Sequence, residues 1–232
     1  MNYRVLEWDS RFFRKRVAQI TVDAATGTDR LSECLGRSDA EVIYVFLPAE
    51  TAEQHRSVLE AFSGKFYDRK ATFRKQVDPA FAAWDLAIVE ATTESEDLLQ
   101  LAYASGHLSR FFLDPGFNEH FRALYAEWIR KALREPDSKV FALSDSRHML
   151  GMVSLSVQDA VGRIGLFAIA DDSRGQGLGM RFLKHCEAHY HSLDARACTV
   201  VTQKANIGAC MLYQKAGYAI ATEQDVWHIW RG

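Results

Sequence analysis

The chain has 232 residues, of which 48% are hydrophobic and four are proline, so it is long enough to bury one large core or two smaller ones. Its formal net charge of -2 at pH 7 gives no general attraction to a polyanion, which argues against nucleic-acid and anionic-membrane partners. The sequence has no apolar stretch near the roughly 20 residues that cross a bilayer, no apolar export segment and no Cys-x-x-Cys pair. We therefore expect a cytoplasmic protein with a small-molecule partner.

Residues 1–85 are expected to form a smaller α/β domain without a catalytic motif, followed by a larger domain over residues 86–232. The expected strands are 5–6, 16–22, 41–47 and 66–77, and the expected helices are 29–36, capped by Asp29, and 49–62. Asp78-Pro79 interrupts this pattern, and a new series of elements starts at residue 87.

The second domain is expected to run strand, two helices, a three-stranded meander, helix, strand, helix and a strand pair. The expected strands are 87–90, 139–144, 149–157, 161–170 and 197–202, followed by a terminal hairpin at 218–230. The expected helices are 94–105 after the capping candidate Thr93, 121–133, 175–191, and 205–216, which Gly217 ends. An aromatic loop is expected at 106–117. Trp227, Ile229 and Trp230 of that hairpin could bury against a second subunit, which would make the protein a homodimer.

The most informative segment is residues 172–180, Asp-Ser-Arg-Gly-Gln-Gly-Leu-Gly-Met, which joins an apolar strand to an amphipathic helix. Glycines at 175, 177 and 179 permit a turn whose N–H groups point outward at the positive end of the helix dipole. A helix N-terminus of this kind binds phosphate. The spacing differs from the dinucleotide fingerprint because the final two-residue gap is missing.

The pattern Arg174-x-x-Gly177-x-Gly179 resembles the acetyl-CoA pyrophosphate loop of the GNAT acetyltransferase superfamily, and the element order from residue 87 matches its topology. The resemblance implies an α/β (α+β) fold in which a mixed, mostly antiparallel sheet is flanked by helices. It implies acetyl-CoA as cosubstrate, with its pantetheine arm along the main chain of Phe167, Ala168 and Ile169. The implied loop residues are Arg174, Gly175, Gln176, Gly177, Leu178, Gly179 and Met180.

Residues 206–218 resemble a second GNAT motif, Asn-x-x-Ala-x-x-x-Tyr-x-x-x-Gly-Tyr. Asn206 and Tyr213 are seven residues apart, two turns along one helix face, so both can border one groove. Attack of an amine on a thioester places negative charge on the leaving sulfur, and a phenol can protonate it as general acid. Tyr213 and Asn206 are therefore the candidate catalytic residues, and Asn206 is also expected at the cofactor; packing of a helix onto the sheet is the alternative role for Tyr213.

The strand at 161–170 carries no carboxylate that could deprotonate the amine. A bound water, a residue from another segment, or loss of the proton in solution could each provide the base. His185, His189 and His191 lack the nearby acid that a metal site would need, so we expect no metal.

Four stretches extend the resemblance over most of the chain: residues 6–13, 109–111 with 125–129, 151–155 with 163–166, and 202–203 with 206–213. They resemble the TDP-fucosamine acetyltransferase family, which acetylates the 4-amino group of a dTDP-linked 4-amino-4,6-dideoxy sugar for surface glycans such as lipopolysaccharide. Arg110 could pair with the nucleotide-sugar diphosphate, and Phe111 and Phe112 could stack on thymine or line the deoxy-sugar methyl. Surface and core packing is the alternative role for these three residues. Two other functions also stay open: acetylation of another amine (an amino acid, a polyamine or a protein N-terminus), and non-catalytic binding of acyl-CoA.

Overall fold

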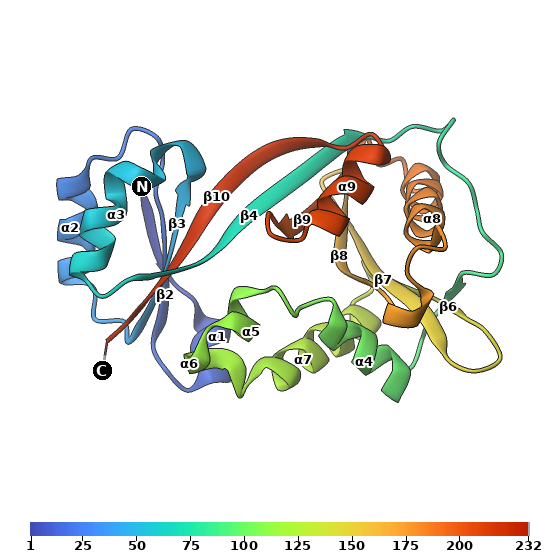
Figure 1. The fold of residues 1–232 in the computed structure, drawn as a ribbon, viewed down its shortest axis with the longest axis horizontal. Helices are drawn as coiled ribbons and strands as arrows, with labels where there is room; N and C mark the ends of the chain where they lie inside the picture. Colours follow the sequence, from blue (N-terminus) through green and yellow to red (C-terminus); the bar gives the residue numbers. More distant parts are fainter. Residues whose placement is uncertain (232) are drawn as a thin grey trace. The chain divides into compact units, whose positions relative to one another are not determined.

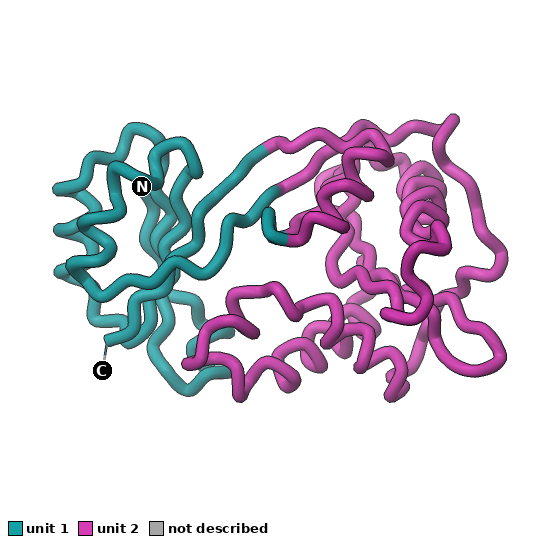
Figure 2. Tube along the Cα trace, in the orientation of Figure 1, with its two compact units in different colours: residues 1–71, 203–205, 222–232 teal, residues 72–202, 206–221 magenta. Residues whose placement is uncertain are grey.

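The computed structural model describes residues 1–231, which form two compact units (Figure 1 and Figure 2). Unit 1 contains residues 1–71, 203–205 and the described residues from 222 onward, and unit 2 contains residues 72–202 and 206–221. The expected domain boundary at residue 85 stays a prediction.

The strands are β1 (Asn2–Val5), β2 (Val17–Thr21), β3 (Val42–Pro48), β4 (Lys65–Gln76), β5 (Val89–Glu90), β6 (Ser138–Ser144), β7 (Met149–Gln158), β8 (Val161–Ile169), β9 (Ala197–Gln203) and β10 (Ala219–Trp230). The α-helices are α1 (Glu7–Phe13), α2 (Thr28–Arg37), α3 (Ala52–Ala61), α4 (Glu96–Ala104), α5 (Arg110–Leu113), α6 (Pro115–Asn118), α7 (Phe121–Arg134), α8 (Leu178–Ser192) and α9 (Ile207–Lys215). The short 3-10 helices are η1 (Ala49–Thr51) and η2 (Asp171–Ser173).

The hydrogen-bonded strand order is β1-β2-β3-β10-β4-β9-β8-β7-β6-β5. The β2–β3 and β8–β9 pairs are parallel, whereas β1–β2, β3–β10, β5–β6, β6–β7 and β7–β8 are antiparallel. Residues of β4 and β10 belong to both units. The expectation of a mixed, mostly antiparallel sheet flanked by helices is confirmed.

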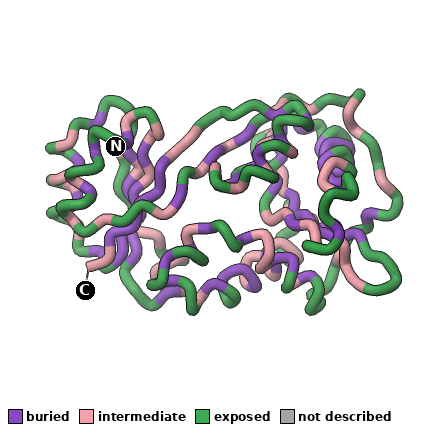
Figure 3. The backbone as a smooth tube through the Cα atoms, viewed as in Figure 1, coloured by how far each residue is buried: buried purple, intermediate pink, exposed green. Residues whose placement is uncertain are grey.

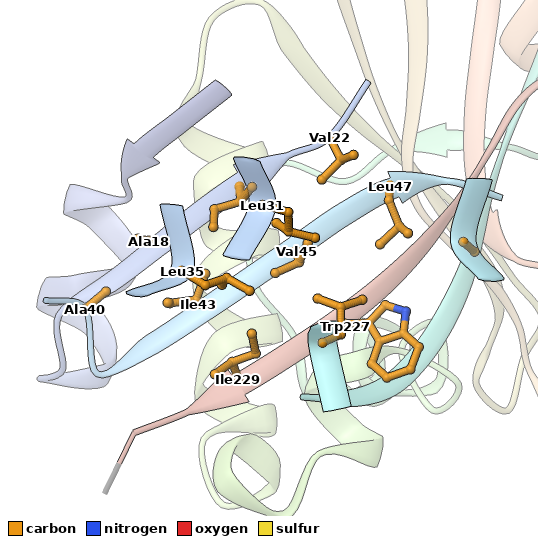
Figure 4. Packing of buried hydrophobic residues seen from close by; sticks show 13 residues of the cluster. Ala18, Val22, Leu31, Leu35, Ala40, Ile43, Val45, Leu47, Trp227 and Ile229 are labelled. Carbon is orange, nitrogen blue, oxygen red and sulfur yellow. The ribbon is translucent and has the colours of Figure 1, made fainter. Parts of the chain in front are cut away.

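Unit 1 has its own hydrophobic core, in which side chains of β2, β3 and β10 pack with those of α2 and α3 (Figure 4). Leu31 and Leu35 of α2 are fully buried in this core with Ile43 and Val45 of β3. β3 therefore shows the near-continuous apolar run typical of a strand covered on both faces.

The expected hairpin at residues 218–230 is wrong, because β10 is one uninterrupted strand that pairs with β3. Trp227 and Ile229 are 3% and 1% exposed in the core of unit 1, so they offer no surface to a second subunit. Asp225 lies within β10, and its buried carboxylate accepts hydrogen bonds from the Arg69 guanidinium at 2.6 and 3.0 Å.

Unit 2 carries helices on both faces of its β6–β8 meander. α4 and α7 pack together against the face that carries Val140 and Ala168, whereas Phe141 and Phe167 meet the rings of α8 on the other face. This division follows the alternation of side chains along each strand.

Several helix boundaries differ from the expected ones. α4 is capped by Ser95 rather than Thr93, because the Ser95 hydroxyl accepts the Leu98 N–H at 3.2 Å. α2 is preceded by Gly27 rather than capped by Asp29, and the aromatic loop contains two short helices, α5 and α6. α1 was not expected.

Candidate functional site

The glycine turn connects β8 to α8 and leaves a row of main-chain N–H groups available. Gly175 and Gly177 adopt φ angles of +76° and +77°, a left-handed conformation that favours glycine, and Gly177 is the N-cap of α8. Within the described part of the chain, the N–H groups of residues 175–179 have no hydrogen-bond acceptor. Residues 174–177 are exposed (Figure 3), so the turn presents donors and the helix dipole to solvent.

The edge of β8 beside this turn is also open. Parallel pairing with β9 ends at Ile164 and Val200, while Phe167, Ala168 and Ile169 stay paired with β7 on the other side. A β-bulge opposite Ser154 marks the divergence, and the Ser154 hydroxyl accepts the Leu166 N–H at 2.8 Å.

A cavity of about 580 Å³ joins the turn, the open strand edge and α9. Its lining includes these expected site residues: Phe167, Ala168, Ile169, Arg174, Gly175, Gly177, Leu178, Gly179, Met180, Asn206 and Tyr213. Gln176 is exposed and does not line it. A groove with main-chain donors at one end and an open strand edge suits an extended ligand that carries a diphosphate.

Asn206 and Tyr213 border this cavity from one helix. Asn206 is the N-cap of α9, where its Oδ1 accepts the Ala209 N–H at 3.1 Å and so fixes the start of the helix. Tyr213 is 4% exposed, and its ring centroid lies 5.5 Å from that of Phe73. Burial raises the pKa of Tyr213 well above its ordinary value, so the phenol stays protonated at neutral pH.

Charged groups at the turn are paired within the turn itself. The Arg174 guanidinium lies 2.7 Å from the Asp171 carboxylate, and both residues line the cavity. The pKa of the Asp172 carboxyl is lowered mainly because the Ser173 hydroxyl donates a hydrogen bond to it. A second, smaller cause is the hydrogen bond from His148 Nε2.

The expected acceptor residues lie outside the cavity lining. Phe111 is 5% exposed and packs against Phe117 and Trp128, and the Arg110 guanidinium lies 4.3 Å above the Phe111 ring. Phe112 is 37% exposed. A contact of these three residues with an acceptor stays a prediction.

One part of the cavity wall, which is formed by the end of α4 and the turn after it, was missed from the sequence. The lining residues there are Ala104, Ser105, His107 and Leu108. The sequence signal for this wall was the pair Gly106-His107 at the start of the aromatic loop, because a glycine often marks a place where the main chain passes close to another part of the protein. The His107 ring packs 5.2 Å from Phe112 and 6.1 Å from Phe121, measured between ring centroids.

The described residues contain no group of three or more His, Cys, Asp or Glu side chains placed to hold a metal ion. None of their helices combines the length and apolar character needed to cross a bilayer.

Comparisons with known proteins give a consistent picture. Residues 101–218 match the model of the acetyltransferase (GNAT) family. The chain is 21% identical over 238 residues to the spore coat polysaccharide biosynthesis protein SpsD of Bacillus subtilis, covering 97% of this chain and 81% of that protein.

Two solved structures share the fold. One is a conserved protein of unknown function from Staphylococcus epidermidis, with a TM-score of 0.69, 10% identity, and coverage of 94% of this chain and 85% of that one. The other is a GCN5-related N-acetyltransferase from Sphaerobacter thermophilus, with a TM-score of 0.59, 15% identity, and coverage of 99% and 77%.

Proposed function

The chain belongs to the acetyltransferase (GNAT) family, whose cosubstrate is acetyl-CoA, and from this premise we propose that it acetylates a nucleotide-activated amino sugar. The acceptor in this proposal is the amino group of a dTDP-4-amino-4,6-dideoxyhexose. The observation that carries acetyl transfer from acetyl-CoA is the cavity in which the glycine turn, the open edge of β8 and Tyr213 come together.

The donor side of the cavity fits acetyl-CoA. The free N–H groups of residues 175–179 would hold the diphosphate, and the edge at Phe167, Ala168 and Ile169 would hold the pantetheine amides. Acetyl-CoA supplies the acetyl group as a reactive thioester. Gly175 and Gly177 keep the turn in a conformation that side chains disfavour, so the donors are in place before the ligand arrives.

We assign the role of general acid to Tyr213, which would hold a proton at its phenolic oxygen for the leaving sulfur. Support comes from its position in the cavity lining. Asn206 caps α9 and thereby orients the helix that carries Tyr213. Asp171 is the carboxylate among the lining residues, and it is paired with Arg174, so water or solvent remains available as base.

The proposed sugar acceptor draws support from two sources. SpsD, to which this chain is similar, is described as a protein of spore coat polysaccharide biosynthesis. The second source is the four stretches that resemble the TDP-fucosamine acetyltransferases. One of them, residues 6–13, lies in the N-terminal region, outside the residues 101–218 that match the GNAT family model.

Product detection by mass spectrometry tests the proposal. The full chain is incubated with acetyl-CoA and one acceptor from a panel: dTDP-4-amino-4,6-dideoxygalactose, spermidine, or a mixture of amino acids. The matched control is dTDP-6-deoxygalactose, which lacks the amine. We expect acetylation of the amino sugar and none of the control sugar; acetylation confined to spermidine or amino acids would contradict the proposed acceptor.

A further inference from the structure

The cavity continues along α9 past Tyr213 to the last turn of the helix. Gly208, Leu212 and Lys215 all line it. Residues three or four positions apart share one helix face, so this face of α9 borders the cavity from its first turn to its last.

Contact between α8 and α9 places the end of this face near the phosphate-binding turn. A Cβ on Gly179 would lie 2.8 Å from the Leu212 Cδ2 atom, so the first turn of α8 lies directly against α9. Lys215 follows Leu212 by three residues, about 4.5 Å along the helix axis. Its flexible four-carbon stem can therefore bring the ammonium group to the groove beside the free N–H groups of the turn.

The charges of the lining identify a ligand group for this ammonium. CoA carries a 3′-phosphate on its ribose in addition to the diphosphate that the turn would hold. Of the cationic side chains that line the cavity, Arg174 is held 2.7 Å from Asp171. Lys215 is exposed and makes no ion pair or hydrogen bond through its side chain with the described residues.

We infer that Lys215 binds the 3′-phosphate of CoA and makes the protein select CoA thioesters over those of dephospho-CoA or 4′-phosphopantetheine. A lysine ammonium serves a phosphomonoester well as a compact point charge. The acyl donor is then free acetyl-CoA rather than an acyl group on a carrier protein, whose phosphopantetheine lacks this phosphate. This inference concerns the donor and is independent of which amine accepts the acetyl group.

A structural role for Lys215 makes a different prediction. A cation in the last turn of a helix stabilises the helix dipole. If that were its whole contribution, replacing Lys215 would lower stability without changing the ratio between the affinities for CoA and dephospho-CoA.

Calorimetric titration of the full chain with CoA and with dephospho-CoA measures this ratio. We expect CoA to bind roughly two- to fivefold more tightly than dephospho-CoA, the range for one exposed charge pair. Lys215→Gln should remove the difference, Lys215→Arg should keep it, and higher salt should reduce it in the unmodified protein. The matched control is Lys131→Gln, which removes an exposed cation from the last turn of α7, outside the cavity, and should leave both affinities unchanged.

Three results would overturn the inference. The first is equal affinity of the unmodified protein for CoA and dephospho-CoA. The second is a Lys215→Gln variant that still prefers CoA as strongly as the unmodified protein does. The third is a preference for CoA that survives Lys215→Gln but is lost in Arg174→Gln. These results differ from the one expected if the turn at residues 175–179 does not bind the diphosphate. CoA and dephospho-CoA both carry the diphosphate, so neither would then bind.

Discussion

Gly106 lies directly against the ring of Tyr125. A Cβ on Gly106 would sit 2.2 Å from Tyr125 Cζ and 2.6 Å from its hydroxyl oxygen. Tyr125 is 5% exposed, and its ring packs 4.6 Å from Phe121 and 4.8 Å from Trp128 between centroids. The turn that brings His107 to the cavity wall is therefore fixed by a close backbone approach to a packed aromatic cluster.

Gly106→Ala should destabilise the protein by about 1–3 kcal/mol, the range for overpacking a core. Urea unfolding measures the change. In the double variant with Tyr125→Ala, the added cost of the Gly106 substitution should be small because the clashing ring is gone. Equal costs of Gly106→Ala in the two backgrounds would contradict this packing account.

Gly177→Ala should weaken CoA binding and cost about 1–2 kcal/mol of stability, because alanine disfavours a left-handed backbone. The strain comes from the φ of +77° rather than from a clash, since a Cβ there has no neighbour within 4 Å. Calorimetry with CoA and thermal unfolding test both effects. The control is Gly36→Ala in α2, where space is also free and φ is not positive; it should raise stability by roughly 0.5–1 kcal/mol.

Tyr213→Phe should lower kcat roughly a hundredfold or more, the usual contribution of a general acid, and leave CoA affinity almost unchanged. Because burial raises the pKa of Tyr213, ionisation of this phenol should not reduce kcat as pH rises to about 10. The control is Tyr190→Phe, which removes a buried hydroxyl that has no hydrogen-bond partner among the described residues, and it should preserve the rate. A Tyr213→Phe enzyme with normal kcat would exclude the acid role.

Glu187→Gln should destabilise unit 2 by about 3–5 kcal/mol, because it leaves the Lys75 ammonium without its counter-charge in a buried site. Lys75 Nζ lies 2.6 Å from Glu187 Oε1, and the Asp78 N–H donates to Glu187 Oε2 at 3.0 Å. The double replacement Lys75→Met with Glu187→Leu should cost less than Glu187→Gln alone. Denaturant titrations of both variants decide the point, and the reverse order of stabilities would refute it.

Stability should fall above pH 9 through Cys198. Burial raises the pKa of this thiol from 9.0 to about 11 in the folded protein, and its Sγ donates to the Tyr218 hydroxyl at 3.1 Å. The protonated Cys198 thiol contributes fully to the free energy of unfolding below pH 9. This contribution is lost as pH rises from 9 to 11, because the thiol loses its proton in the unfolded chain at a lower pH than in the folded protein. The loss should be on the order of 2 kcal/mol.

Urea unfolding at intervals from pH 7 to pH 10.5 would reveal this loss. Cys198→Ala should be less stable at pH 7 yet lose less stability as the pH rises. An equally steep decline in both proteins would show that Cys198 does not cause it.

The sequence predicted elements whose signals are local. The regular apolar stripe of residues 121–133 corresponds to α7, and the glycine pattern at 175, 177 and 179 falls at the start of α8. Asn206 was expected to border the groove, and its own side chain caps α9. Each of these features depends on residues within a few positions of one another.

What the sequence missed depends on distant partners. The single strand β10 replaces the expected hairpin at 218–230, and Arg69, which pairs with the Asp225 carboxylate in that strand, lies 156 positions earlier. α1 gave no signal because Trp8 is exposed and the helix has no clean apolar stripe. His107 could not be placed at the cavity because its position depends on the fit between Gly106 and Tyr125.

The pairing of β10 with β3 has a consequence for biogenesis. Residues 222–231 complete the core of unit 1, although a ribosome makes them long after residues 1–71 have emerged. The β3 edge that pairs with β10 therefore stays unpaired until residues 222–231 have been synthesised. Nascent chains halted before residue 222 should expose that edge to chaperones and proteases, whereas chains carried through Trp230 should bury it.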